Sequence, residues 1–257
     1  MAMLAFVATG FAQKKLVLYF SETQTTQKVA LALQEQLSLP DKAVVAIELV
    51  EPYTGNMMET MQRAQREKQP ALKPLKAKIA DYDIIFLGYP IWSGTYALPI
   101  ASLLKQEDFA GKTIVPFCTF GSGGLESSMA DLKKALPKAT IKPGYGVRQA
   151  RVASATKELD RFLKENGYVA GKVKALPAYS AQQPVTDAEK AIFDAACSSY
   201  QFPLGTPQTF GKRTTDDSID YEFKVKSQGF GGGGESTIYV TMGKEAGAKP
   251  EFTRVVR

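Results

Sequence analysis

Histidine is absent from this chain of 257 residues, and its absence removes several classes of function. Histidine is the commonest general base, the proton carrier of the usual serine triad and a frequent ligand of zinc and haem. Cysteine occurs only twice, at Cys118 and Cys197, and the two form no CxxC pair. Two buried hydrophobic residues are the simplest interpretation. A disulfide between them is the alternative if the protein is exported. No metal site and no catalytic side chain are predicted.

A hydrophobic run long enough to span a bilayer is also lacking. Residues 3–12 are mostly apolar and end in small residues, but a membrane helix needs about 20 apolar residues. The run resembles the apolar core and cleavage region of a secretory signal peptide, without the basic segment that should precede it. We therefore expect residues 1–13 to be the remnant of a truncated export signal on a periplasmic or extracytoplasmic protein. The alternative is a frayed N-terminus on a cytoplasmic protein.

Charge of one sign is not concentrated anywhere in the sequence. The formal net charge is +6, but the lysines and arginines are dispersed along the chain. No predicted helix interleaves basic residues with aromatic ones, so nucleic-acid binding is not expected. Apolar residues make up 44% of the chain, which is enough to bury a core and excludes a disordered class.

Short apolar runs alternate with segments of helical pattern over the first two-thirds of the chain. The runs at 15–20, 43–50, 84–87 and 113–117 have no helical period, which suits strands that are buried on both faces. Helical patterns follow at 29–37, 56–68, 98–104, 125–136 and 154–166. This order predicts βαβ units and an α/β fold with a doubly wound parallel sheet. Ligands of such sheets bind beyond the carboxyl ends of the strands.

The pattern changes after Gly167. We predict a first domain over 14–170, a polar linker over 171–186 and a small α+β domain over 187–257. A helix is expected to start at 186–189, and apolar and polar residues alternate over 221–226 and 237–242, with a third candidate strand at 252–256. These strands predict an antiparallel sheet with one solvated face. Gly229–Gly234 is interpreted as a connector, because no helix start follows it to make a phosphate site.

Hydroxyl groups gather in the turn after the first strand, at Ser21, Thr23, Thr25 and Thr26. Hydroxyls and backbone N–H groups at a helix N-terminus bind anions. The turn lacks the GxxxxGK[ST] of a nucleotide triphosphate site and the GxGxxG of a dinucleotide site. A phosphate monoester held by neutral donors is the chemistry that remains, and a threonine-rich helix cap is the alternative.

Two further turns follow later strands. The segment 88–95 holds the only tryptophan, Trp92, whose large aromatic face can stack on a flat ring, with capping of the core as the alternative. Gly94 leaves its peptide free to reorient toward a ligand. The segment 119–124 is rich in glycine, which lets the main chain approach a flat ring closely.

Together these turns resemble the flavodoxin family over about residues 14–168. The first turn is similar to the family's [ST]-x-T-G-x-T phosphate loop, except that Gln24 stands where the family has glycine. The segments 88–92 (GYPIW) and 119–124 (TFGSGG) are similar to those that surround the flavin ring. The resemblance implies a flavodoxin-like doubly wound five-stranded parallel sheet that binds FMN. The residues implied in FMN binding are Ser21, Thr23, Gln24, Thr25, Thr26, Pro90, Ile91, Trp92, Ser93, Gly94, Thr119, Phe120, Gly121 and Gly123.

The implied function is electron transfer or flavin-dependent oxidoreduction, in which the cofactor supplies the redox chemistry. The partner is expected to be a redox protein or a small electron acceptor, with NAD(P)H as a candidate donor and a quinone-like acceptor. The protein could act as a one-electron shuttle between redox partners or as a two-electron reductase of a small acceptor. A basic chain with an additional domain favours the reductase. The alternative from another class is an exported binding or scaffolding protein in which Gln24 marks a degenerate flavin site.

Overall fold

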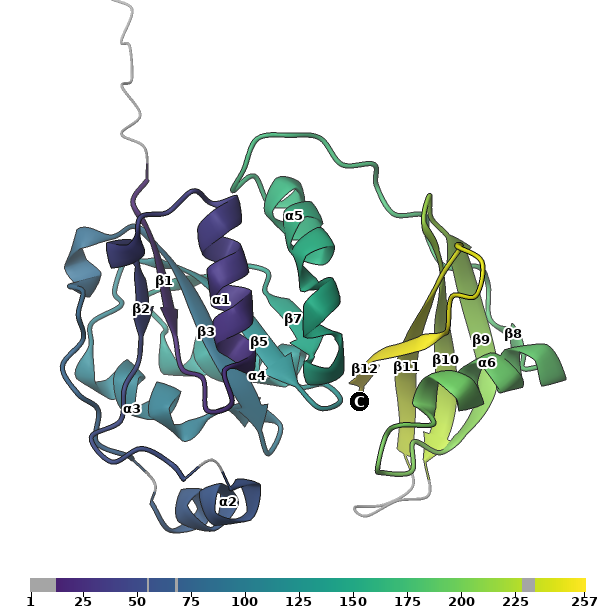
Figure 1. Ribbon diagram of the computed structural model, residues 1–257, viewed down its shortest axis with the longest axis horizontal. Helices are drawn as coiled ribbons and strands as arrows, with labels where there is room; N and C mark the ends of the chain where they lie inside the picture. The colour runs from purple at the N-terminus through teal and green to yellow at the C-terminus, as the bar shows by residue number, and fades with distance from the viewer. Residues whose placement is uncertain (1–12, 55, 68, 228–233) are drawn as a thin grey trace, which may run out of the picture.

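The computed structural model describes residues 13–54, 56–67, 69–227 and 234–257. The segment expected to be a signal-peptide remnant lies outside these residues except for Gln13, and so does most of the glycine-rich connector, 228–233. The described chain forms two units, a parallel sheet with helices on both faces and an antiparallel sheet with one helix (Figure 1). None of the described helices is long and apolar enough to cross a membrane.

The first unit contains the predicted doubly wound parallel sheet. Its strands lie in the order β2-β1-β3-β5, and both β6 and β7 pair with the outer side of β5. The strands are β1 (Lys15–Tyr19), β2 (Val44–Ala46), β3 (Ile84–Trp92), β5 (Thr113–Phe120), β6 (Thr140–Ile141) and β7 (Tyr145–Arg148), with β4 (Thr95–Tyr96) antiparallel to the end of β3. The helices are α1 (Thr25–Gln36), α2 (Met57–Arg66), α3 (Leu98–Gln106), α4 (Leu125–Ala135) and α5 (Ala155–Glu165).

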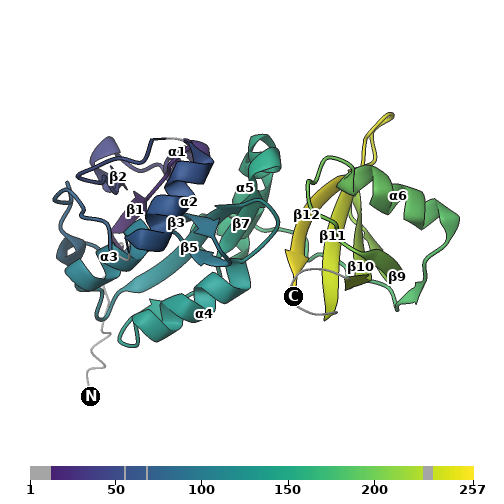
Figure 2. The same ribbon diagram turned by 90° about the horizontal axis from the view of Figure 1, so that it is seen from below.

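Strand alternation produces two separate cores, one on each face of this sheet. Leu16 and Leu18 face the core under α3 and α4, whereas Val17 and Tyr19 face the core under α1 and α5. Successive side chains of a strand point to opposite faces, so a strand that is apolar throughout must be covered on both. Figure 2 shows the two pairs of helices on opposite sides of the sheet. The helix α2 belongs to neither pair and lies at the end of the sheet toward which the strands run (Figure 1).

Several boundaries differ from those expected. The run at 43–50 yields only the three-residue strand β2, because it begins in the short 3-10 helix Asp41–Ala43 and its register with β1 ends at Ala46. The strands expected at 84–87 and 113–117 continue to Trp92 and Phe120. The fifth strand was not located in the sequence, because it is split into β6 and β7 by a segment that contains Pro143.

The second unit is an antiparallel sheet in the order β12-β11-β10-β9-β8. Its elements are β8 (Gln183–Pro184), α6 (Asp187–Cys197), β9 (Thr206–Thr214), β10 (Ser218–Ser227), β11 (Gly234–Gly243) and β12 (Glu251–Val256). The strands β8 and β9 were not expected, and β8 lies inside the segment 171–186 that was interpreted as a linker. The alternating residues Phe223 and Val225 are buried together with Phe193 of α6, so the helix covers one face. Both cysteines are free.

The glycine at position 88 is fixed by the packing of neighbouring strands, which gives a test of the fold. A Cβ atom at Gly88 would lie 2.1 Å from Cζ of Phe117, so Gly88→Ala should lower the free energy of unfolding by about 1–3 kcal/mol through overpacking. Urea denaturation measures this change. The matched control is Gly121→Ala, where a Cβ meets no atom within 4 Å and the stability should change little. Equal effects of the two substitutions would contradict the packing that we describe.

Candidate functional site at the carboxyl edge

Three turns leave the carboxyl ends of β1, β3 and β5 and contact one another. The amide of Phe20, where the first turn begins, donates to the carbonyl of Gly88 at 3.0 Å. The hydroxyls of Thr26 and Thr119 are 2.8 Å apart and join the first turn to the third. A Cβ atom at Gly124 would lie 2.6 Å from Ile91, so the third turn packs directly on the second. The three sequence motifs therefore lie together at this edge of the sheet.

The first turn places Gln24 in the conformation that glycine prefers. Gln24 is the N-cap of α1, with φ of 60° and ψ of 2°, in the left-handed region. Its side chain is exposed and makes no capping hydrogen bond. A non-glycine residue in this region costs about 1–2 kcal/mol. Gln24 therefore adopts a conformation that glycine favours, and its exposed side chain makes no hydrogen bond to the helix N-terminus.

The amino end of α1 has the character of an anion site. The first amides of a helix have no partner within the helix, and the helix dipole concentrates positive potential there. The amide of Gln27 donates to Ser21 Oγ at 3.2 Å, which folds the turn back over the helix end. The exposed hydroxyl of Thr23 lies 3.0 Å from that of Thr25, and both belong to the same turn. These hydroxyls and first-turn amides can donate together to a phosphate.

Thr26, Thr119 and Phe120, which the resemblance places among the FMN-binding residues, have buried side chains. The side chains of Thr26 and Thr119 are 1% and 4% exposed, and their hydroxyls satisfy each other. Phe120 is 4% exposed and packs in the core under α3 and α4. These three residues are therefore buried, and their side chains hold the turns together.

The second turn, expected over 88–95, is a tight hairpin between β3 and β4. β3 runs on to Trp92, which pairs with Thr95 of β4, so Ser93 and Gly94 are the two turn residues. Their φ values are 49° and 85°, and two successive residues with positive φ are typical of the turn that connects paired antiparallel strands. Pro90 and Ile91 precede it as half-buried residues of the strand. Pairing with β4 thus fixes the position of Trp92 at the end of β3.

Trp92 is half-buried between two other aromatic rings. Its ring centroid lies 5.8 Å from that of Phe20 and 5.4 Å from that of Tyr53, with edge-to-face geometry in both pairs. The stacking and core-capping interpretations of Trp92 are therefore not exclusive, because a half-buried ring keeps part of its surface open. The carbonyl of Gly94 accepts a hydrogen bond from Ser127 Oγ at 2.5 Å, which reorientation of this peptide would break.

The third turn is held by the second unit of the protein, which the sequence did not suggest. The amide of Val255 in β12 donates to the carbonyl of Ser122 at 2.7 Å. A Cβ atom at Gly123 would lie 2.3 Å from the carbonyl oxygen of Val255, so only glycine permits this approach. Gly121 is exposed, and a Cβ there would meet no atom within 4 Å. The turn therefore has one face against β12 and one open face.

Arg148 at the end of β7 links the third turn to the second unit. Its side chain donates through Nε to the carbonyl of Gly121 at 2.7 Å and through a terminal nitrogen to the carbonyl of Phe252 at 3.0 Å. The guanidinium lies 4.1 Å from the ring centroid of Phe252. Only 8% of the residue is exposed, and this burial lowers the pKa of the guanidinium. Arg148 and the Val255 amide bind the turn through two of its carbonyls, those of Gly121 and Ser122. These contacts therefore do not use the amide N–H groups of the turn.

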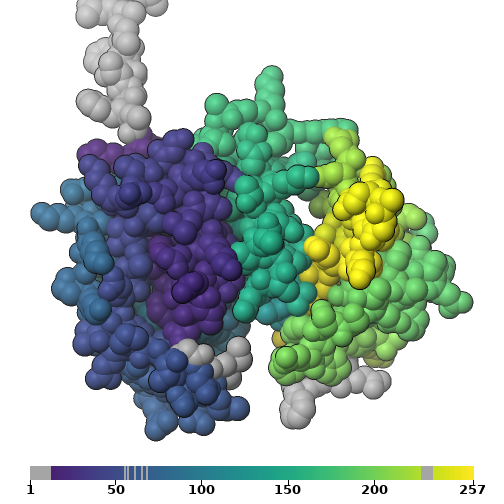
Figure 3. Space-filling model, viewed as in Figure 1, coloured from purple at the N-terminus to yellow at the C-terminus, as the bar shows by residue number. Residues whose placement is uncertain are grey.

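The two units are otherwise separated by a groove. Figure 3 shows them as two lobes with a hollow between them. The groove lies between α5 and the outer face of the second sheet, with Arg151 and Tyr239 among the residues that line it. Arg151 pairs with Glu158 of its own unit at 2.7 Å and with Glu251 of β12 at 2.8 Å. Polar contacts across one end of the groove therefore supplement the contact at the third turn.

The comparison with known proteins identifies the family of the first unit. The model of the family described as Flavodoxin matches residues 14–165, which is more than half of the chain. The chain belongs to the flavodoxin family. A candidate flavoprotein from Bacteroides uniformis ATCC 8492 is 26% identical, with a TM-score of 0.52, over 60% of this chain and 99% of that one. A flavoprotein solved in complex with FMN from Lactobacillus acidophilus NCFM is 20% identical, with a TM-score of 0.46, over 57% and 99%. No curated protein is similar enough to count as a match.

The match to the flavodoxin family covers the first unit of this chain and ends before the second unit. The matched residues end at Glu165, the last residue of α5. The contacts of β12 with the third turn thus join a segment outside the family match to one of the family's own turns. Arg148 and Tyr53 were not among the predicted site residues. Tyr53 stands in none of the motifs found in the sequence, and Arg148 ends β7, a strand that the sequence pattern did not reveal.

The buried pair of threonines gives a prediction about how the turns are held. Thr119→Val should lower the free energy of unfolding by about 1–3 kcal/mol, because it leaves the buried hydroxyl of Thr26 without its partner. The double variant Thr26→Val/Thr119→Val removes both hydroxyls and should recover most of that loss. Urea denaturation of the two single variants and the double variant measures the coupling. Strictly additive effects would show that the hydroxyls do not depend on each other.

Arg148 gives a second prediction, about the contact between the units. Arg148→Met should speed hydrogen exchange of the Val255 amide by about tenfold or more, because a buried guanidinium hydrogen bond contributes about 1.5–3 kcal/mol. The control is Arg254→Met, which removes an exposed ion pair with Glu126 across the same contact and should have a much smaller effect. Unchanged exchange in Arg148→Met would mean that other contacts hold β12 in place.

Proposed function

We propose that this flavodoxin-family protein binds FMN at the carboxyl edge of its first sheet and acts as a flavin-dependent oxidoreductase. The observation that carries the proposal is the convergence of three family-type turns on one surface, joined by the Thr26–Thr119 hydrogen bond and the packing of Gly124 on Ile91. FMN supplies hydride and electron transfer when it is bound. The absence of histidine is compatible with this chemistry, since the cofactor and not a side chain carries the redox step.

The residues divide by the part of FMN that they would hold. Ser21, Thr23 and the first-turn amides of α1 would bind the phosphate, which is favoured by the helix dipole. Trp92 and the Ser93-Gly94 hairpin would line the ring. The open face of Gly121 would let main-chain amides reach the polar edge of the ring, and the contacts of this turn with β12 use its carbonyls. The described residues therefore fit a phosphate tail and a flat heterocycle.

We favour a two-electron reductase over a one-electron shuttle. A reduced nicotinamide would give up a hydride and become oxidised, and a quinone-like acceptor would take two electrons and two protons to become a hydroquinone. One proton arrives with the electrons as hydride, and the second comes from solvent. The support is the net charge of +6 and the second unit, because a shuttle is expected to dock its redox partners through an acidic surface around the flavin.

The alternative function, a binding protein with a degenerate flavin site, depends on Gln24 disturbing the phosphate turn. The backbone of Gln24 holds the left-handed conformation, and its exposed side chain makes no capping hydrogen bond at the helix end.

Titration of flavin-free protein with FMN and with riboflavin tests the proposal. FMN fluorescence should be quenched on binding, and FMN should bind at least about tenfold more tightly than riboflavin, because a hydrogen bond to a charged group contributes about 1.5–3 kcal/mol. Thr23→Val should weaken FMN binding by about tenfold and leave riboflavin binding unchanged. Thr156→Val, an exposed threonine in α5, is the control. A protein that binds neither flavin refutes the proposal, and equal affinities would place the phosphate elsewhere.

A further inference from the structure

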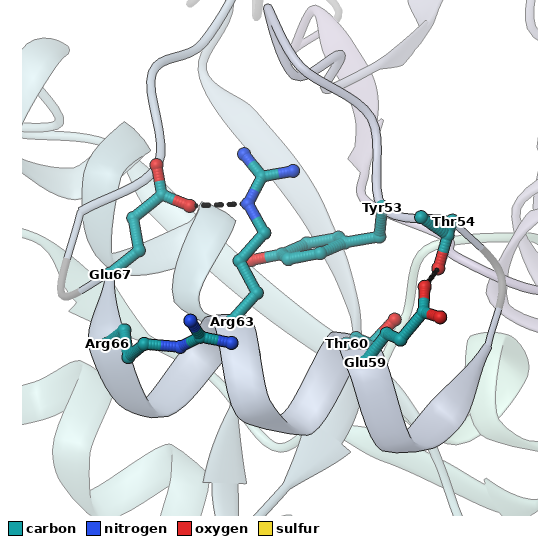
Figure 4. A pocket seen from close by; sticks show the side chains of 7 residues that line it. All are labelled: Tyr53, Thr54, Glu59, Thr60, Arg63, Arg66 and Glu67. Carbon is teal, nitrogen blue, oxygen red and sulfur yellow. Dashed lines mark hydrogen bonds and ion pairs between the residues drawn. The ribbon is translucent and has the colours of Figure 1, made fainter.

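A cavity of about 570 Å³ lies between α2 and the segment that precedes it. Figure 4 shows the ring of Tyr53 lying along α2, with side chains of the helix, among them Thr60, Arg63 and Arg66, around it. Ligand pockets for small organic molecules commonly have volumes of about 300–1,000 Å³. None of the residues expected to hold FMN lines this cavity. It is large enough for a second small molecule.

The cavity adjoins the surface proposed to bind FMN. The ring centroid of Tyr53 lies 5.4 Å from that of Trp92 in the second turn. The hydroxyl of Thr60 lies 3.5 Å from a carboxylate oxygen of Glu22 in the first turn. A molecule in this cavity would therefore be next to two of the three turns, as an electron acceptor must be.

The hydroxyl of Tyr53 is buried and has no hydrogen-bond partner among the described residues. The residue is 8% exposed, and Figure 4 shows its hydroxyl pointing toward the side chain of Arg63. Leaving a buried hydroxyl unsatisfied costs about 1–3 kcal/mol, so such a group calls for a partner that binds at the site. Burial also raises the pKa of Tyr53, which keeps the phenol protonated and able to donate.

The two arginines of the cavity differ in what they already bind. Arg63 donates to Glu67 at 2.7 Å and to the carbonyls of Glu51 and Pro52, and its guanidinium lies over the Tyr53 ring at 4.8 Å. Arg66 is exposed and donates only to the carbonyl of Gln62 at 3.3 Å, with no carboxylate partner in the part of the chain that the structure describes. Arg66 is therefore the cation that remains to pair with a ligand.

We propose that this cavity binds the electron acceptor, and that the acceptor is a quinone carrying an anionic substituent. A quinone carbonyl would accept a hydrogen bond from the Tyr53 hydroxyl, and the anionic substituent would pair with Arg66. The ring would lie against the apolar surface that Tyr53 and the stems of the arginines provide. This assignment rests on the proposed function, since it names the acceptor for that same flavin surface. It adds Tyr53 and Arg66 as binding residues that the family's flavin turns do not include.

The test uses two quinones that differ in charge, 1,4-naphthoquinone-2-sulfonate and neutral 2-methyl-1,4-naphthoquinone. Binding to the flavin-free protein is measured by quenching of the fluorescence of Trp92, the only tryptophan in the chain. The wild type should bind the sulfonate about tenfold more tightly than the neutral quinone, and Arg66→Gln should abolish that preference. Arg66→Lys should retain most of it. Lys105→Gln removes one exposed positive charge on α3 and should leave both affinities unchanged.

The Tyr53 hydroxyl is tested separately with Tyr53→Phe, which keeps the ring beside Trp92. This variant should weaken the binding of both quinones several-fold and leave the affinity for FMN unchanged. A loss of FMN affinity in Tyr53→Phe would assign the hydroxyl to the cofactor and overturn the proposal. In the flavin-loaded protein, Arg66→Gln should raise KM for the sulfonated quinone and not for NADPH. A rise for NADPH alone would make the cavity a donor site.

The same measurements separate this proposal from the proposed function. Failure of both quinones to quench Trp92, with FMN binding intact, removes the acceptor site and leaves the flavoprotein. Quinone binding without FMN binding removes the flavin function. A sulfonate preference that survives in Arg66→Gln overturns the assignment of Arg66.

Discussion

The parallel register of β1, β3 and β5 is the constraint on which the candidate site depends. Tyr19 lies opposite Gly88, and Gly88 lies opposite Phe117, so the three strands are in phase just before the turns begin. From this row β1 stops at once, whereas β3 and β5 continue to Trp92 and Phe120. Along the direction of the strands, the first turn therefore begins before the other two, beside the hairpin of β3 and β4. Gly88 makes this alignment sterically feasible, because the ring of Phe117 occupies the space where any other side chain would begin.

The second unit of the protein contacts the third turn and covers part of it. The amide of Val255 in β12 donates to Ser122, and Val255 packs against Gly123, so one side of this glycine-rich turn is covered. Arg148 completes the contact by donating to both units while its guanidinium lies over the ring of Phe252. A buried cation that satisfies carbonyls of two units is destabilising if either unit withdraws, so the contact favours a defined position of the second unit. The ring edge proposed to meet this turn and the second sheet thus share one short segment of main chain.

The cavity beside α2 adjoins the candidate site and has a different chemistry. The turns after β1, β3 and β5 offer main-chain groups, hydroxyls and one tryptophan. The α2 side offers guanidinium groups and a phenol, with Tyr53 in contact with Trp92 at the border between the two. Neutral donors suit a cofactor phosphate at a helix end, and a charged wall suits a ligand that must be held without a helix dipole. A binding surface with two such halves is compatible with a reaction that brings a bound cofactor and a second molecule together.

The sequence by itself determined the parallel sheet, the three turns and the family, because these depend on local patterns. Strands buried on both faces appear as unbroken apolar runs, and turns at strand ends appear as clusters of glycine and hydroxyl residues. The sequence also located the one position, Gln24, where the phosphate turn departs from the family pattern. The tertiary structure decided what depends on distant residues. It made Thr26 and Thr119, 93 positions apart, a buried pair, and Trp92 the end of a strand whose hairpin partner is only two residues long. It also placed Arg148 and β12 against the third turn, because pairing between remote segments leaves no periodic signal in either segment.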